Sequence, residues 1–209
     1  MNKEKIVYLI DDDKFIIRAL SLLLKSENYD VAAFNSAEEF LKYEVQNRIG
    51  CIILDVNLEG QTGLELQEEL IKRSSYLPII FITGQGDIPM SVQALKKGAV
   101  NFLPKPFDDN QLLEAVKEGM ERCLSVMNDL NEQNNAKKLI DKLTPREFEV
   151  LQYVISGFLN KQIAAELNIS EQTVKIHRGK ITEKLGVKSV AEIVRLTEKT
   201  GIKSALDTA

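Results

Sequence analysis

Histidine and cysteine are scarce in this chain of 209 residues, which contains one histidine and two cysteines. Cys51 and Cys123 both lie in apolar stretches, and neither has a second Cys or His at a metal-binding spacing. The scarcity argues against a metal centre built from Cys and His, and we expect two reduced thiols in the core.

Long apolar runs are also missing, because the longest is far short of the roughly 20 residues that a membrane-spanning helix needs. The N-terminal segment has only a five-residue apolar stretch before three acids, unlike a signal peptide. We therefore expect a cytoplasmic protein with no membrane partner. Its length suits one large domain or two modest ones, and the pattern described below favours two.

The net charge of −4 is divided unevenly along the chain. Residues 1–125 contain 14 Lys and Arg against 20 Asp and Glu, whereas residues 126–209 contain 13 against 11. Only the C-terminal part has the positive balance that nucleic-acid binding favours, and this small excess is weak support by itself.

The first 122 residues alternate short, continuous apolar runs with longer stretches of helical periodicity. Unbroken apolar runs are typical of parallel strands covered on both faces. The pattern predicts an open, five-stranded parallel α/β sheet with helices on both faces. The runs are KIVYLI, VAAF, CIILD, PIIFIT and VNFL, and the helical stretches are 14–26, 36–46, 63–73, 88–97 and a helix from 108 onward.

Four of these runs stop at polar residues suited to phosphoryl chemistry. YLI ends at Asp11 and Asp12, CIIL at Asp55, IIFI at Thr83, and NFL leads to Lys105. Neighbouring parallel strands bring such residues to one edge of a sheet, where ligands bind. A carboxylate there can attack phosphorus if nearby positive charge offsets its repulsion from the phosphoryl group.

The same residues predict a site for a divalent cation and a phosphoryl group. Asp11, Asp12 and Asp55 with one backbone carbonyl would suffice for Mg²⁺. Lys105 would pair with one phosphoryl oxygen, and Thr83 would donate a hydrogen bond to another. The simpler alternative is that the acids at 11–13 only cap the following helix and that Lys105 is a surface lysine.

The last helix of this half has a heptad stripe that continues past the sheet. We predict that the helix ends in the polar stretch around 131–138. Two interpretations remain open: packing on the sheet up to Cys123 followed by a solvated linker, or a helical spacer that also pairs two subunits. The stripe consists of Leu113, Val116, Met120, Cys123, Met127 and Leu130.

From Thr144 onward, capping residues mark four helices with no strand between them, which predicts an all-α unit with a helix-turn-helix. The predicted helices run from Pro145 to Gly157 after the Thr144 cap, over 160–167, from the Ser170 cap to about Leu185, and from a Ser189–Glu192 capping box with Val190, Ile193, Val194 and Thr197 on one face.

The third of these helices, EQTVKIHRGKITEKL, has an apolar side and a basic side. A solvated basic face is the ordinary explanation for such a helix. A capped start, an apolar anchor and a basic opposite face together nevertheless form a shape able to enter a major groove. The apolar side has Val174, Ile181 and Leu185, and the basic side has Lys175, His177, Arg178, Lys180 and Lys184.

Residues 1–122 resemble the receiver domain of two-component response regulators, through IDDD at 10–13, Asp55, TG at 83–84 and KPF at 105–107. The segment TGQGDIPMSVQALKKGAVNFLPKPF is similar to the FixJ branch of the NarL/FixJ family, especially its styrene- and toluene-type regulators. The resemblance implies a flavodoxin-like receiver.

This resemblance also implies a role for each residue of the site. It implies that Phe102 is an aromatic switch whose side chain follows Thr83, and that the Lys105–Pro106 bond is cis. The implied site has Asp55 as phosphoacceptor, Mg²⁺ (or Mn²⁺) on Asp11, Asp12, Asp55 and the Asn57 carbonyl, and phosphoryl contacts from Thr83 and Lys105.

Residues 143–196 resemble the LuxR/NarL type of helix-turn-helix, through LTPREFEVL, NKQIAAELNIS and TVKIHRGKITEKL. The resemblance implies binding to double-stranded promoter DNA, with Ile193 and Val194 in a dimer seam; ordinary core packing explains either residue about as well. The implied contacts are Thr173, Lys175, Ile176 and Arg178 nearest the bases or backbone, and Lys161, Gln162, His177 and Lys180 in support of phosphate contacts.

The sequence departs from the family pattern at two positions. Relatives usually have Pro where this chain has Glu59, so we expect the loop DVNLEGQTG to be less rigid and more acidic near the metal. Gly179 stands where some relatives have a base-contacting lysine, so base preference does not transfer.

We expect a receiver at 1–122, a helical linker at 123–142 and a DNA-binding domain at 143–209.

The phosphodonor has to be a separate molecule, because the only histidine lies in the second domain and no glycine-rich ATP-binding segment is present. The resemblance identifies it as a sensor histidine kinase. We expect a transcription factor, not an enzyme, that forms a homodimer when Asp55 is phosphorylated and acts with RNA polymerase.

Two other classes remain as alternatives. A phosphohydrolase would ordinarily need a second acid two residues after the nucleophile, where Asn57 stands. A constitutive DNA-binding regulator would use its receiver only as an interaction module.

Overall fold

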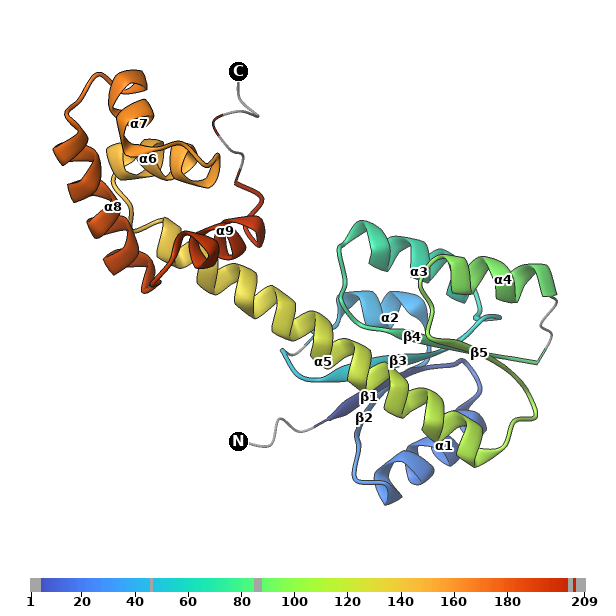
Figure 1. Cartoon of the computed structure of the whole chain (residues 1–209). Coiled ribbons are helices and arrows are strands. Elements are labelled where there is room, and N and C mark those ends of the chain that lie inside the picture. The colour runs from blue at the N-terminus through green and yellow to red at the C-terminus, as the bar shows by residue number, and fades with distance from the viewer. Residues whose placement is uncertain (1–4, 46, 85–87, 203–204, 206–209) are drawn as a thin grey trace. The chain divides into compact units, whose positions relative to one another are not determined.

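The computed structural model describes residues 5–45, 47–84, 88–202 and 205. The chain divides into two compact units between Met127 and Asn128. Unit 1 is an α/β sheet and unit 2 is a bundle of helices (Figure 1). None of the helices in the described ranges combines the length and the apolar character that crossing a membrane requires.

Unit 1 has a five-stranded parallel sheet in the order β2-β1-β3-β4-β5. Each strand pairs only with parallel neighbours, so all carboxyl ends meet at one edge of the sheet. The predicted fold class is therefore confirmed. The strands are β1 (Ile6–Ile10), β2 (Asp30–Phe34), β3 (Gly50–Asp55), β4 (Ile79–Thr83) and β5 (Asn101–Pro104).

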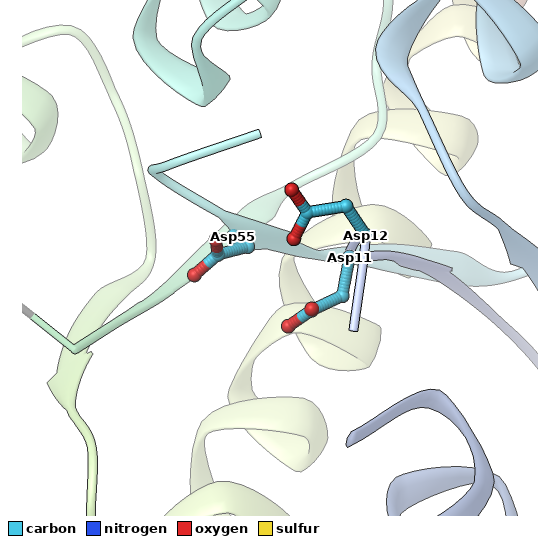
Figure 2. Close-up of side chains that lie close together, drawn as sticks. All are labelled: Asp11, Asp12 and Asp55. Atoms are coloured by element: carbon cyan, nitrogen blue, oxygen red, sulfur yellow. The ribbon is translucent and has the colours of Figure 1, made fainter. Parts of the chain in front are cut away.

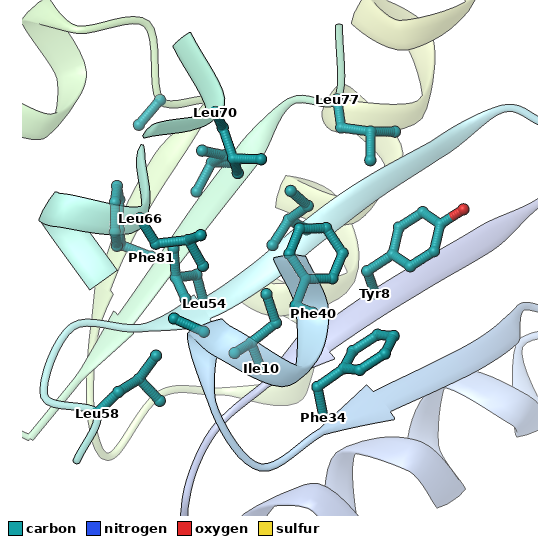
Figure 3. Close-up of a cluster of buried hydrophobic side chains, with 14 of the residues drawn as sticks. Tyr8, Ile10, Phe34, Phe40, Leu54, Leu58, Leu66, Leu70, Leu77 and Phe81 are labelled. Carbon is teal, nitrogen blue, oxygen red and sulfur yellow. The ribbon is translucent and has the colours of Figure 1, made fainter. Parts of the chain in front are cut away.

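Two apolar clusters hold helices on both faces of the sheet, because successive strand residues point to opposite faces. Val7 and Leu9 pack with α1 and α5, whereas Tyr8 and Ile10 pack with α2, α3 and α4. Figure 3 shows part of the second cluster, in which Phe40 lies close to Tyr8 and Phe34. The helices are α1 (Lys14–Ser26), α2 (Ala37–Lys42), α3 (Gly63–Lys72), α4 (Ile88–Lys96) and α5 (Asp109–Ile140).

Helix α2 is shorter than the predicted 36–46. Tyr43 leaves the helix with extended backbone angles, φ −79° and ψ 134°. Its ring then packs edge-to-face on Phe34 and Tyr8. The helix thus ends where Tyr43 contacts residues of β1 and β2, and such contacts cannot be read from the local sequence.

Helix α5 continues to Ile140, so the prediction that it ends in the polar stretch around 131–138 is wrong. Residues 131–135 are exposed, but Ala136 and Ile140 are 5% and 7% exposed, and the apolar packing of unit 2 includes Ile140. Toward the other end, Met127 is still part of the sheet cluster, whereas Leu130 is 42% exposed. Packing on the sheet therefore extends one turn beyond Cys123.

Unit 2 contains the four predicted helices: α6 (Pro145–Ile155), α7 (Asn160–Glu166), α8 (Glu171–Leu185) and α9 (Val190–Glu198). Thr144 and Glu147 form a reciprocal capping box for α6, and Ser170 caps α8. The predicted Ser189–Glu192 box differs in one bond. Ser189 accepts from the Glu192 N–H, but the Glu192 carboxylate accepts from the N–H of Lys188.

Candidate functional site

Three carboxylates meet beyond the carboxyl ends of β1 and β3. Asp11 and Asp12 directly follow β1, and Asp55 is the last residue of β3. Because these strands are neighbours, one oxygen from each residue lies within 4.8 Å of the others (Figure 2). Asp11 is 0% exposed and Asp55 is 5% exposed, so the mutual repulsion of their charges is weakly screened by solvent.

Helix capping does not explain this cluster, because Asp13 caps α1. Its Oδ1 accepts a hydrogen bond from the Phe15 N–H at 2.7 Å. The Asp13 N–H in turn donates to Asp11 Oδ1 at 2.8 Å, which orients the buried carboxylate. Asp11 and Asp12 therefore remain available for another role.

Lys105 places its ammonium between two of the carboxylates. Nζ lies 2.8 Å from Asp11 Oδ2 and 3.2 Å from Asp55 Oδ1. The Lys105 N–H donates to the Thr83 carbonyl at 2.7 Å, which ties this segment to the end of β4. The Lys105–Pro106 bond is cis. Lys105 is thus part of the cluster and not a free surface lysine.

The pKa values reflect a balance between burial and charge. Burial raises the pKa of Asp55 and the nearby Asp11 charge adds to this effect, although the Lys105 ammonium opposes it. Burial alone would lower the pKa of Lys105, but its hydrogen bond and ion pairs to Asp11 and Asp55 raise it overall. The lysine therefore stays charged, and Asp55 carries a carboxylate that is poorly solvated.

Thr83 ends β4 on the other side of Asp55 and is fully buried. Its hydroxyl accepts a long hydrogen bond, 3.4 Å, from the Asn57 side-chain amide, and the Asn57 N–H donates to Asp55 Oδ2 at 3.1 Å. Phe102 on β5 is partly buried, with its ring centroid 6.0 Å from that of Phe81. Two hydrogen bonds of Asn57 thus connect the Asp55 carboxylate with the Thr83 hydroxyl at the end of β4.

A glycine allows α3 to start directly against the strand end. The Gly63 N–H donates to the Val56 carbonyl at 2.9 Å. A Cβ at residue 63 would lie 2.3 Å from the Asp55 carbonyl oxygen. The sequence analysis did not single out Gly63. The available signal was the pair Thr62-Gly63, a capping residue followed by a glycine at the start of the helical stretch.

The donor set fits a small, hard cation. Mg²⁺ binds through a few carboxylates together with waters and phosphate oxygens, and Mn²⁺ accepts the same oxygen ligands. Asp11, Asp12 and Asp55 supply carboxylate oxygens that lie within 4.8 Å of one another. The arrangement is therefore compatible with magnesium.

Helix α8 of unit 2 has the predicted two-sided character. Val174, Ile181 and Leu185 are at most 2% exposed and anchor one side in the core. On the other side Ile176 is 50% exposed. Of the remaining residues predicted to contact DNA, Lys161, Gln162, Lys175 and Lys180 are exposed, and Thr173, His177 and Arg178 are partly buried.

Several of these side chains also have structural contacts. Arg178 donates to Asn160 Oδ1 at 3.0 Å, which joins α8 to the start of α7. Gln162 accepts from the Leu159 N–H at 2.8 Å. The Nδ1 atom of His177 is buried and has no hydrogen-bond partner among the described residues, so only the other ring nitrogen is suited to a phosphate contact.

Lys184 does not face outward with the other basic residues, contrary to the prediction. Its Nζ lies 2.6 Å from Glu147 Oε2 and 3.2 Å from the Lys142 carbonyl. Glu147 is only 3% exposed, so it attracts the lysine to the core side of α8. The basic face consequently has one charge fewer than the sequence predicts.

Comparisons with known proteins agree for both units. Residues 7–117 match the family model of the response regulator receiver domain, and residues 141–197 match that of bacterial regulatory proteins of the luxR family. Nodulation protein W of Bradyrhizobium diazoefficiens is 44% identical over 95% of this chain and 88% of its own length. Response regulator protein TodT of Pseudomonas putida strain F1 is 40% identical over 99% and 90%. A solved structure of the response regulator StyR is 43% identical, with a TM-score of 0.82 over 94% of this chain and 99% of that one.

Proposed function

Since this chain belongs to the response regulators that join a receiver domain to a LuxR-family DNA-binding domain, we propose that phosphorylation of Asp55 controls its binding to promoter DNA. One observation carries the proposal. The Asp55 carboxylate stands at a strand end with the Lys105 ammonium 3.2 Å away and two further carboxylates close by. Such a group can accept a phosphoryl group, because cations offset the charge that arrives.

The reaction forms one bond and breaks one. An Asp55 oxygen attacks phosphorus, an acyl phosphate forms, and the bond from phosphorus to the donor breaks, so that the donor keeps the electron pair. The donor in the cell is the phosphohistidine of a sensor histidine kinase. The chain catalyses its own modification and is a regulator, not an enzyme with turnover.

Asp11, Asp12 and Asp55, with the Asn57 carbonyl, would hold Mg²⁺. A bound Mg²⁺ neutralises charge on the phosphoryl oxygens and aligns the donor. Lys105 contributes a second positive charge from the side of Asp11 and stays protonated because its pKa is raised.

The Thr83 hydroxyl responds to phosphorylation by donating a hydrogen bond to one of the phosphoryl oxygens. In its contact with the Asn57 amide the hydroxyl is the acceptor, so that contact does not compete with donation to a phosphoryl oxygen. A change in the position of Phe102, whose ring lies beside that of Phe81, then alters the surface around α4 and β5 and favours a homodimer.

The DNA-binding domain converts the change in pairing into binding to promoter DNA. Helix α8 enters the major groove with Thr173, Lys175, Ile176 and Arg178 toward the bases or backbone, and pairing through α9 brings two copies onto one duplex. Bound to promoter DNA in the cytoplasm, the dimer affects transcription by RNA polymerase.

The test is labelling by a small acyl phosphate in Mg²⁺, followed by intact mass spectrometry. Asp55→Asn is expected to abolish labelling, because an amide cannot form the acyl phosphate. Asp13→Asn is the matched control: it removes an acid from the same site edge but keeps a good helix cap, and it should label like the wild type. Full labelling of the Asp55→Asn protein would exclude Asp55 as the acceptor.

A further inference from the structure

Asp12 is held by a backbone group from a different loop. The Glu59 N–H donates to Asp12 Oδ2 at 3.2 Å, across 47 positions of sequence. The preceding residue, Leu58, is 7% exposed and belongs to the apolar cluster under α3, which anchors this part of the loop. The donor is therefore a fixed part of the site edge.

The other two carboxylates accept their backbone hydrogen bonds from residues close by in the sequence. Asp11 accepts from the N–H two residues later, at Asp13, and Asp55 accepts from the N–H two residues later, at Asn57. Asp12 instead accepts its backbone hydrogen bond from the loop that follows β3. Whether residue 59 has a backbone N–H therefore bears directly on where Asp12 lies.

We propose that the backbone N–H of Glu59, and not its carboxylate, positions Asp12 and makes the site select Mg²⁺ over Ca²⁺. The inference rests on the proposed function, since it concerns the same cation. With Oδ2 accepting from the N–H, Oδ1 is the oxygen that we expect Asp12 to present to a cation. One-oxygen coordination suits Mg²⁺, which requires near-ideal octahedral geometry, whereas Ca²⁺ takes six to eight oxygens and often both oxygens of one carboxylate.

Proline provides a clean way to remove the donor, because it has no backbone N–H. Gly60 has φ 86°, the conformation found at the third position of a type II turn, in which proline is common at the second position. Glu59→Pro is therefore compatible with this loop. Glu59→Ala is the matched control, because it removes the carboxylate and keeps the N–H.

The experiment is calorimetric titration of the unphosphorylated full chain with Mg²⁺ and, separately, with Ca²⁺. We expect Glu59→Pro to weaken Mg²⁺ binding about tenfold, the lower end of the effect of losing a group that orients a ligand. Ca²⁺ binding should weaken less, because the released Oδ2 becomes available to it, so the ratio of the two dissociation constants shifts. Glu59→Ala should leave that ratio unchanged.

Each contrary outcome has a distinct meaning. Equal weakening of both cations in Glu59→Pro would show a general loosening of the loop and overturn the proposal. So would equal effects of the two variants, which would assign the role to the carboxylate, or no effect of either. A wild-type chain that binds no Mg²⁺ would instead refute the metal site of the proposed function.

Discussion

Burial and the Lys105 ammonium have opposite effects on the ionisation of Asp55. Burial raises the pKa of its carboxyl group, and the ammonium of Lys105 limits that rise from 3.2 Å away. The same ammonium binds Asp11 more closely, at 2.8 Å. Lys105 thus makes a cluster of acids tolerable at a strand end, and we infer that it turns partly toward phosphoryl oxygens when Asp55 is modified.

A change at Gly63 tests how tightly this strand end is packed. In Gly63→Ala the new Cβ would lie 2.3 Å from the Asp55 carbonyl oxygen, so the backbone has to shift. We expect unit 1 to lose about 2 kcal/mol of unfolding free energy, as in other overpacked sites, and labelling of Asp55 to slow. Differential scanning calorimetry and the labelling assay measure the two effects.

Gly84→Ala is the control for this prediction, because a Cβ there would meet open space. Its melting temperature should match the wild type. A Gly63→Ala protein with wild-type stability would mean that α3 can withdraw from the strand end at little cost.

The strand-end residues were predictable because hydrophobic runs that stop at Asp, Thr and Lys are a local pattern. The structure brings Asp11, Asp12, Asp55, Thr83 and Lys105 to one edge, although their individual roles stay predictions. The N–H of Glu59 was not predictable. A backbone donor carries no residue signature, and the expectation of a less rigid loop gave no hint that it holds Asp12.

A buried carboxylate links α6 to α8 in addition to their apolar packing. Glu147 accepts from the Lys184 ammonium at 2.6 Å and from the Thr144 N–H at 2.8 Å, and these bonds lower its pKa from 4.5 to about 2. Since the folded state favours the ionised form, this stabilisation is present above about pH 4.5 and is lost as the pH falls toward 2.

Glu147→Gln should therefore destabilise unit 2 at pH 7 and make its melting temperature less dependent on pH between 4.5 and 2. Glu149→Gln, two residues along on the exposed side of α6, is the control and should cost much less. Circular dichroism melts at pH 7 and pH 3 give the comparison. If Glu147→Gln kept the acid sensitivity of the wild type, another group would be responsible.

Helix and strand positions followed from the sequence wherever the signal was local. Thr144, Ser170 and Gly186 bound α6 and α8 as their capping preferences predict. Longer-range contacts caused the errors. The stretch 131–138 is mostly polar, yet α5 continues through it because Ala136 and Ile140 are buried in unit 2. Lys184 was predicted to lie on the basic face, since its partner Glu147 is 37 positions away in the sequence.

The whole molecule joins a receiver domain to a DNA-binding domain of the LuxR family. The proposed link is a change in pairing between two copies. A coupling free energy of roughly 1–3 kcal/mol is enough to alter DNA affinity about 5- to 150-fold.

The most direct test is the affinity of the full chain for a duplex selected from a random-sequence pool by the phosphorylated protein. It is measured in Mg²⁺ at fixed salt, with and without a small acyl phosphate, because salt strongly affects DNA affinity. We predict that phosphorylation tightens binding within the range given above, and that the Asp55→Asn protein does not respond. Equal affinity of the phosphorylated and unphosphorylated wild type, or an equal response of Asp55→Asn, would contradict control through Asp55.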